Sequence, residues 1–158
     1  MAQLIQAAAA LAFPTTTGTG EPLAMTPWRL VAGNRYSLTI SVPALSALAN
    51  GQVIANTPNL PTGAQGTLRS AQFRVGATPA STAAKLATAT LGISGVACTG
   101  GVISLTSANC TPAGNSVAST TITALNTFTG GQSIGFTISA VTAFVEGNGD
   151  FLVYYTLD

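Results

Sequence analysis

Histidine is absent from this sequence, and ionisable side chains of every kind are rare. Lysine and arginine together number 5 and aspartate and glutamate 4, so charged residues make up 6% of the chain, against about 25% in ordinary domains. General acid–base catalysis relies mainly on histidine or paired carboxylates, and a hydroxyl nucleophile requires an activating base. The sequence therefore predicts a non-enzymatic protein with no catalytic residues and no cofactor.

The same shortage excludes other classes of partner. Five scattered basic residues cannot form the positive patch that neutralises nucleic-acid phosphates. A structural zinc site needs about four ligands, which two cysteines without histidine do not supply. No apolar run reaches the roughly 18 residues that a membrane-spanning helix requires. We expect no nucleic acid, no metal and no membrane as partners.

The two cysteines, Cys98 and Cys110, are separated by a segment that contains a Gly-Gly pair. A short disulfide loop would join them if that segment turns back on itself. Two free, buried thiols fit equally well with synthesis in the cytoplasm. The sequence leaves both alternatives open.

What the sequence does contain is apolar and small neutral residues, with 47% of the chain hydrophobic. Disordered chains are usually charged and poor in apolar residues, so this composition indicates a folded protein. A free monomer normally keeps a charged, mixed surface. We therefore expect much of the surface to be covered by copies of the chain or by a larger particle. The alternative is a secreted domain with a Ser/Thr-rich surface.

The chain divides into residues 1–25, an N-terminal arm with a flexible link, and residues 26–158, a single domain. Residues 2–12 are apolar apart from Gln3 and Gln6, and residues 15–22 form a loose link after Pro14. No lysine or arginine precedes the apolar stretch, so we do not predict a secretory signal. The arm is expected to dock on a neighbouring subunit or to cover an edge of its own sheet.

From residue 28 onward the pattern is that of short strands separated by Gly, Asn and Pro. Residues 35–42 alternate most clearly, with Tyr36, Leu38, Ile40 and Val42 on one face. Similar runs recur every 8–15 residues, which predicts an all-β fold, a single jelly-roll-like β-sandwich. Residues 43–66 hold three prolines and three glycines and are predicted to be a long contact loop with one helical turn near residues 44–49.

The last segment predicts a hairpin whose strands are residues 142–145 and 151–157. Asn148-Gly149 would form its tight turn, with Glu146 and Asp150 close together on either side. A calcium loop needs more oxygen ligands, and a glycosidase pair needs one carboxyl with a raised pKa. We therefore interpret the acids as turn residues. Residues 151–157 are apolar on both faces, which indicates a central strand or a strand covered by another subunit.

Two segments resemble a known class of protein. They are PTGAQGTLRSAQFRVGATPASTAAKLATATLGISGVACTGG, which ends at Gly101, and ASTTITALNTFTGGQSIGFTISAVTAFVEGNGDFLVYY, which begins at Ala118. The neutral Ala/Thr/Gly-rich strands, the F-x-x-G-x-x-I step from Phe128 to Ile134 and the glycine-bounded final segment resemble small β-sandwich structural proteins of tailed bacteriophages, of the capsid decoration (cement) and tail-tip type. The resemblance covers roughly residues 62–157.

That resemblance implies a virion structural protein on the outer capsid surface, a homo-oligomer and most simply a trimer, bound to the major capsid protein. Alternatives are a phage tail-fibre or receptor-binding domain and a secreted adhesin or pilin-like subunit. Expected subunit contacts come from the arm, the long loop and the final turn. They are Leu4, Ile5, Leu11, Phe13, Leu45, Leu48, Val53, Ile54, Leu60, Glu146, Asn148 and Asp150.

Overall fold

The computed structural model describes residues 35–56, 59–79, 86–142 and 146–158. They belong to a compact unit that runs from Arg35 to Asp158, and the predicted arm lies outside the described residues. The elements are β1 (Arg35–Val42), the 3₁₀ turn η2 (Leu45–Ala47), β2 (Val53–Ala55), β3 (Gln65–Ala77), β4 (Leu86–Ile93), β5 (Val96–Thr106), β6 (Ser116–Ala118), β7 (Thr127–Thr129), β8 (Ile134–Ser139) and β9 (Asn148–Leu157).

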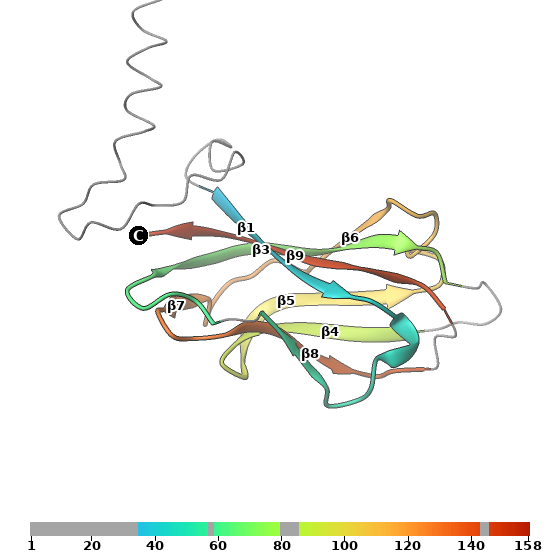
Figure 1. The fold of residues 1–158 in the computed structure, drawn as a ribbon, viewed down its shortest axis with the longest axis horizontal. Coiled ribbons are helices and arrows are strands. Elements are labelled where there is room, and N and C mark those ends of the chain that lie inside the picture. The colour runs from blue at the N-terminus through green and yellow to red at the C-terminus, as the bar shows by residue number, and fades with distance from the viewer. Residues whose placement is uncertain (1–34, 57–58, 80–85, 143–145) are drawn as a thin grey trace, which may run out of the picture. The chain divides into compact units, whose positions relative to one another are not determined.

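The strands form two antiparallel sheets that face each other, which confirms the predicted all-β sandwich (Figure 1). Sheet A has the order β1-β9-β3-β6, with β7 also paired to β3, and sheet B has the order β2-β8-β4-β5. The pairs β1–β9, β2–β8, β3–β6 and β4–β5 are nested along the chain. Such nesting, with β7 as an extra strand, is the connectivity of a jelly roll.

The core lies between the sheets because buried apolar residues alternate with more exposed ones along the longer strands. Phe151 of β9 stacks on Phe136 of β8, with ring centroids 4.2 Å apart at 20°. It also meets Phe73 of β3 edge-on at 5.1 Å. All three rings are fully buried. These three aromatic side chains therefore connect the two sheets at the centre of the core.

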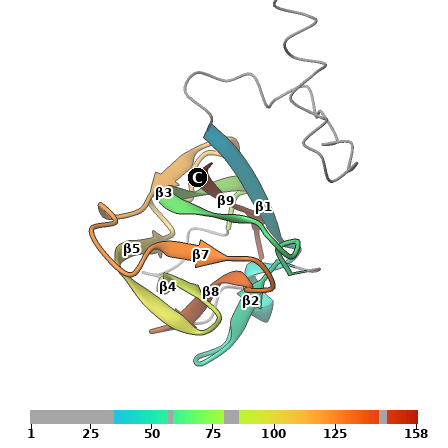
Figure 2. The same cartoon turned by 90° about the vertical axis from the view of Figure 1, so that its left-hand side faces the viewer.

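One side of the sandwich is closed by the chain between β5 and β8 (Figure 2). β6 and β7 pair with different parts of β3. Between them the chain pairs with β5, where the Thr99 N–H donates to the Ala124 carbonyl at 2.9 Å and the Thr120 N–H donates to the Val102 carbonyl at 2.8 Å. The same segment thus covers the edges of both sheets.

Two predicted loops contain regular structure. The helical turn expected near residues 44–49 is confirmed as η2, but the long loop of residues 43–66 also contains β2 and the start of β3. β2 is only three residues long and pairs with β8, so its sequence is too short to show alternation. The Gly-Gly pair between the two cysteines does not form a turn, because Gly100 and Gly101 lie inside β5 with positive φ angles of 84° and 70°. The turn between β4 and β5 falls instead at Ser94 and Gly95, also at positive φ.

The predicted final hairpin is wrong. Asn148 and Gly149 lie in β9, where Gly149 is paired with Val42 of β1 and Val75 of β3. Tertiary pairing with strands far away in sequence overrode the local Asn-Gly turn signal. Most of the other proposed hairpin strand, residues 143–145, lies outside the described residues. The prediction that residues 151–157 form a central strand is confirmed, because β9 runs between β1 and β3.

Candidate interaction surface

Among the residues that the structure describes, no three His, Cys, Asp or Glu side chains gather where a metal ion could be held. No helix in this part of the chain is long and apolar enough to cross a membrane. The ionisable side chains are distributed unevenly between the two outer faces of the sandwich.

The outer face of sheet A carries charge. Arg69 and Arg74 are exposed on β3, and Asp150 is half-buried on β9. The Ser41 hydroxyl donates to Asp150 Oδ1 at 2.7 Å, and Arg69 Nε donates to Thr156 Oγ1 at 3.1 Å. In the middle of this face Gln72 Nε2 donates to the Tyr154 hydroxyl at 3.0 Å. With these charged side chains and cross-strand polar contacts, the outer face of sheet A resembles an ordinary solvent-exposed protein surface.

The outer face of sheet B carries no charge. The sequence has no Asp, Glu, Lys or Arg in β2, β4, β5 or β8, or anywhere in residues 86–142. The side chains that alternate with the buried ones are small and neutral: Val53 and Ala55 on β2, Thr137 and Ser139 on β8, Thr88 and Thr90 on β4, and Ser104 and Thr106 on β5. A surface without ionisable groups can be covered without the large cost of burying a charge, provided that its hydroxyls keep hydrogen-bond partners.

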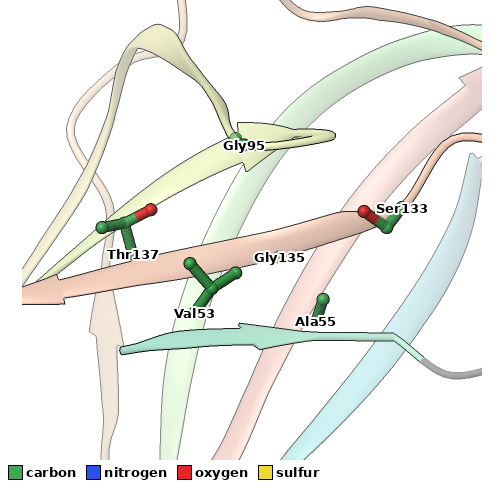
Figure 3. Close-up of a pocket in the computed structure, with 7 residues that line it drawn as sticks. Val53, Ala55, Gly95, Ser133, Gly135 and Thr137 are labelled. Carbon is green, nitrogen blue, oxygen red and sulfur yellow. The ribbon is translucent and has the colours of Figure 1, made fainter. Parts of the chain in front are cut away.

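A shallow hollow lies on this face between β2 and the β4–β5 turn (Figure 3). It exists because Gly92 and Gly135 have no side chains, and Val53, Ala55 and Thr137 form part of its rim. Its volume is about 10 Å³, enough for one water molecule at most. Val53 is 57% exposed beside it. The hollow therefore makes the face uneven, but it is too small to bind a ligand.

A larger hollow of about 230 Å³ lies over the ends of β1, β3 and β9, lined by Ser41, Pro43, Gly76, Asn148 and Asp150 among others. Ligand pockets usually exceed about 300 Å³ and are mostly apolar. Its one carboxylate, from Asp150, already accepts the bond from Ser41. Nothing in this arrangement supplies a nucleophile with a base or a set of metal ligands.

The structure divides the expected contact residues into separate groups. Leu45 and Leu48 are 0% and 7% exposed and pack in the domain's own core; as subunit contacts they were wrong, because η2 closes one end of the sandwich. Ile54 and Leu60 are half-buried against the same core. The exposed residues are Val53, Glu146 and Asn148. Asp150 is half-buried, and Leu4, Ile5, Leu11 and Phe13 lie outside the described residues.

Two of the expected contact segments lie together. The Leu45 N–H of η2 donates to the Gly147 carbonyl at 2.8 Å. Gly147 has φ of 102°, a conformation that glycine adopts without strain. A side chain there would also meet Leu45 Cδ1 at 2.9 Å. Gly147 is therefore held against η2 by this contact.

The two cysteines are free and buried, which excludes the disulfide alternative in this structure. Cys98 lies near the start of β5, and Cys110 follows its end, where its N–H donates to the Thr106 carbonyl at 3.0 Å. Cys98 and Thr106 are eight residues apart along the strand, a span of about 26 Å, and Cys110 lies beside Thr106. A disulfide needs Cα atoms within about 7 Å, so the two cysteines are too far apart to form one. Burial raises the pKa of both thiols, which lowers their reactivity.

Sequence reasoning overlooked the charge-free face. The available signal was the position of the charged residues, since none falls within residues 86–142, but only sheet order shows that this stretch supplies three of the four strands of one sheet.

No protein-family model matches the chain, and no curated protein or solved structure shows significant similarity to it.

Proposed function

We propose that this chain is a non-enzymatic structural subunit of a virion, a capsid decoration or cement protein that holds neighbouring shell subunits together. Its partners are other copies of itself, with a trimer favoured, and the major capsid protein. It is made in the host cytoplasm and acts on the outer capsid surface.

The observation that carries the proposal is the charge-free outer face of sheet B. Designed and natural soluble surfaces contain roughly 25–35% charged residues, and charged residues are depleted at the centre of protein interfaces. The face therefore has the composition of a covered surface, while sheet A has that of an exposed one. The jelly roll is compatible with this role, since viral capsid proteins use it, but lectins and cupins use it as well.

The size of the face explains why many copies would be needed. The strands β2, β8, β4 and β5 have 3, 6, 8 and 11 residues, and at about 3.3 Å per residue and about 4.8 Å between strands they cover roughly 440 Å². A stable interface buries about 800 Å² from each partner. One such face alone gives a weak contact, whereas an oligomer with several faces gains affinity through effective concentration. A shell that repeats the same binding site many times would allow several faces of one oligomer to bind at once.

The test is co-sedimentation of the full chain with empty shells of the virus that encodes it, together with a mass measurement of the free protein. We expect a stable oligomer that saturates the shells at a fixed stoichiometry. A monomer that ignores shells would refute the proposal, and if it bound cells it would favour a tail-fibre or receptor-binding role.

A pair of variants tests which face is used. Thr137→Lys places a charge in the middle of sheet B, because Thr137 is exposed on β8 and is paired with β2 and β4. Ser70→Lys places the same charge on β3 of sheet A, also at an exposed position. We expect shell binding to fall at least tenfold for Thr137→Lys and to change little for Ser70→Lys. Equal binding by both variants would contradict the assignment of the face.

A further inference from the structure

The edges of the two sheets differ in how well they are covered. The edge strands β2, β6 and β7 are three residues long each, and short edges are one way in which proteins avoid unwanted pairing. β5 is longer, but residues 120–124 hydrogen-bond to it. β1 has eight residues and, among the described strands, pairs with β9 alone. Figure 2 shows it at the margin of sheet A.

β1 also lacks the usual protection of an open edge. From Tyr36 to Val42 it contains no lysine, no proline and no charged residue, and its register with β9 has no bulge. Natural edge strands are normally blunted by such features. Ile40 and Val42 are buried in the core, whereas Thr39 and Ser41 are exposed on the outer face. The strand is therefore regular and neutral along its length.

The order of side chains in β1 is symmetric about Thr39. The central five residues read Ser-Leu-Thr-Ile-Ser, flanked by Tyr36 and Val42. Antiparallel strands place residues of the same face directly opposite each other. Pairing β1 with a second β1 about Thr39 matches Leu38 with Ile40 and Ser37 with Ser41. Apolar side chains thus meet apolar ones on the inner face, and hydroxyls meet hydroxyls on the outer face.

The two ends of the strand limit this pairing. Pro43 follows β1 and has no N–H to donate, so the added ladder stops there. Arg35 of one copy would lie opposite Pro43 of the other. The two Arg35 residues would be about 26 Å apart, beyond the screening distance of about 8 Å at physiological salt. The charges of the two Arg35 residues therefore do not oppose the association.

We propose that β1 is a self-association edge: two copies of the chain pair antiparallel through residues 37–41 about a two-fold axis at Thr39, which joins two five-stranded sheets into one. The occupant is a second copy because the near-palindromic sequence complements itself in this register. The inference does not depend on shell binding, and it adds a two-fold contact to the proposed function.

The test uses Thr39→Cys in the full chain under mild oxidation. Residues opposite each other in an antiparallel pair have Cα atoms about 4.5–5.5 Å apart, which suits a disulfide. The native thiols of Cys98 and Cys110 are buried and leave the background low. We expect a reducible covalent dimer whose yield rises with protein concentration.

Two matched variants test the register. Residues 37 of the two copies would be about 13 Å apart, so Ser37→Cys alone should not cross-link. A mixture of Ser37→Cys and Ser41→Cys should give a covalent heterodimer, because these positions lie opposite each other. If Thr39→Cys stays monomeric, the proposal is overturned and the edge is covered by another segment, such as the residues before β1. A cross-link between Ser37→Cys and Thr39→Cys copies in place of the expected pair would overturn the register.

A charge test gives a second readout without oxidation. Thr39→Lys would set two ammonium groups against each other at the axis and weaken dimerisation by about tenfold or more. Ser70→Lys adds the same charge at an exposed position on β3, away from both β1 and sheet B, and should leave the oligomeric mass of the protein unchanged. Mixing Thr39→Lys with Thr39→Glu should restore the dimer in sedimentation velocity. Association of Thr39→Lys equal to that of the unaltered chain would refute the proposal.

Discussion

The aromatic contacts between the sheets allow a quantitative prediction for Phe151→Leu. The Phe151 ring is stacked on Phe136 at 4.2 Å and meets Phe73 edge-on at 5.1 Å. Each aromatic pair contributes about 0.5–1.5 kcal/mol beyond its buried area, so the loss of both pairs should lower the free energy of unfolding by about 1–3 kcal/mol. This is a large share of the roughly 5–15 kcal/mol that stabilises a domain.

Phe128→Leu is the matched control. Phe128 is almost fully buried, but among the aromatic rings of the described residues it contacts Tyr155 alone, at 5.5 Å. The same substitution there removes one aromatic pair and should lower the free energy of unfolding by about 0.5–1.5 kcal/mol. Urea denaturation followed by tyrosine fluorescence measures both values, provided that the slope of the transition is unchanged.

A double-mutant cycle isolates the stack itself. If Phe136 and Phe151 interact as their geometry indicates, the effects of Phe136→Leu and Phe151→Leu should differ from additivity by about 0.5–1.5 kcal/mol. Additivity within about 0.3 kcal/mol would refute the reasoning, since it would mean that the two rings fill volume in the core without a specific interaction.

Two further predictions concern backbone packing and pH. Gly149→Ala places a methyl group against the backbone and an aromatic ring of β3 and should destabilise the domain by about 2 kcal/mol or more; Gly51→Ala, which meets no atom but has a positive φ angle, should cost only about 1 kcal/mol, and chemical denaturation compares them. Burial raises the pKa of Cys98 and Cys110 above the usual 9.0 and that of Tyr155 above 10.0. The unfolded chain loses these protons first as pH rises, so stability is full below pH 9.0 and declines above it. Replacing both cysteines by alanine should make the loss of unfolding free energy with pH shallower, as measured by denaturation curves at increasing pH. An unchanged loss would contradict the conclusion that the buried thiols cause it.

The sequence by itself determined the class of the fold and the location of much of its core. Strict alternation in residues 35–42 placed Ile40 and Val42 together on one face, and both are buried, because side chains of a strand point to opposite faces in turn and only one face of this sheet lies against the core. The two apolar faces of residues 151–157 likewise predicted a central strand, and β9 is one.

Local signals failed where distant pairing decided the outcome. Asn148-Gly149 is a strong turn signal on its own, yet β1 and β3 pair on both sides of it and hold it extended. Gly100 and Gly101 lie within β5 without ending it, because residues 120–124 supply hydrogen bonds along its edge. β2 has no recognisable pattern and exists through its pairing with β8.

The shortage of charge was visible in the sequence, but its arrangement was decided by the tertiary structure. Only the jelly-roll order brings β2, β8, β4 and β5 into one sheet and leaves Arg69, Arg74 and Asp150 on the other. The same order leaves β1 at an edge while it protects β3 and β5. Composition is a property of the chain, whereas a face or an edge is made by residues that are distant in sequence and become neighbours only when the strands pair.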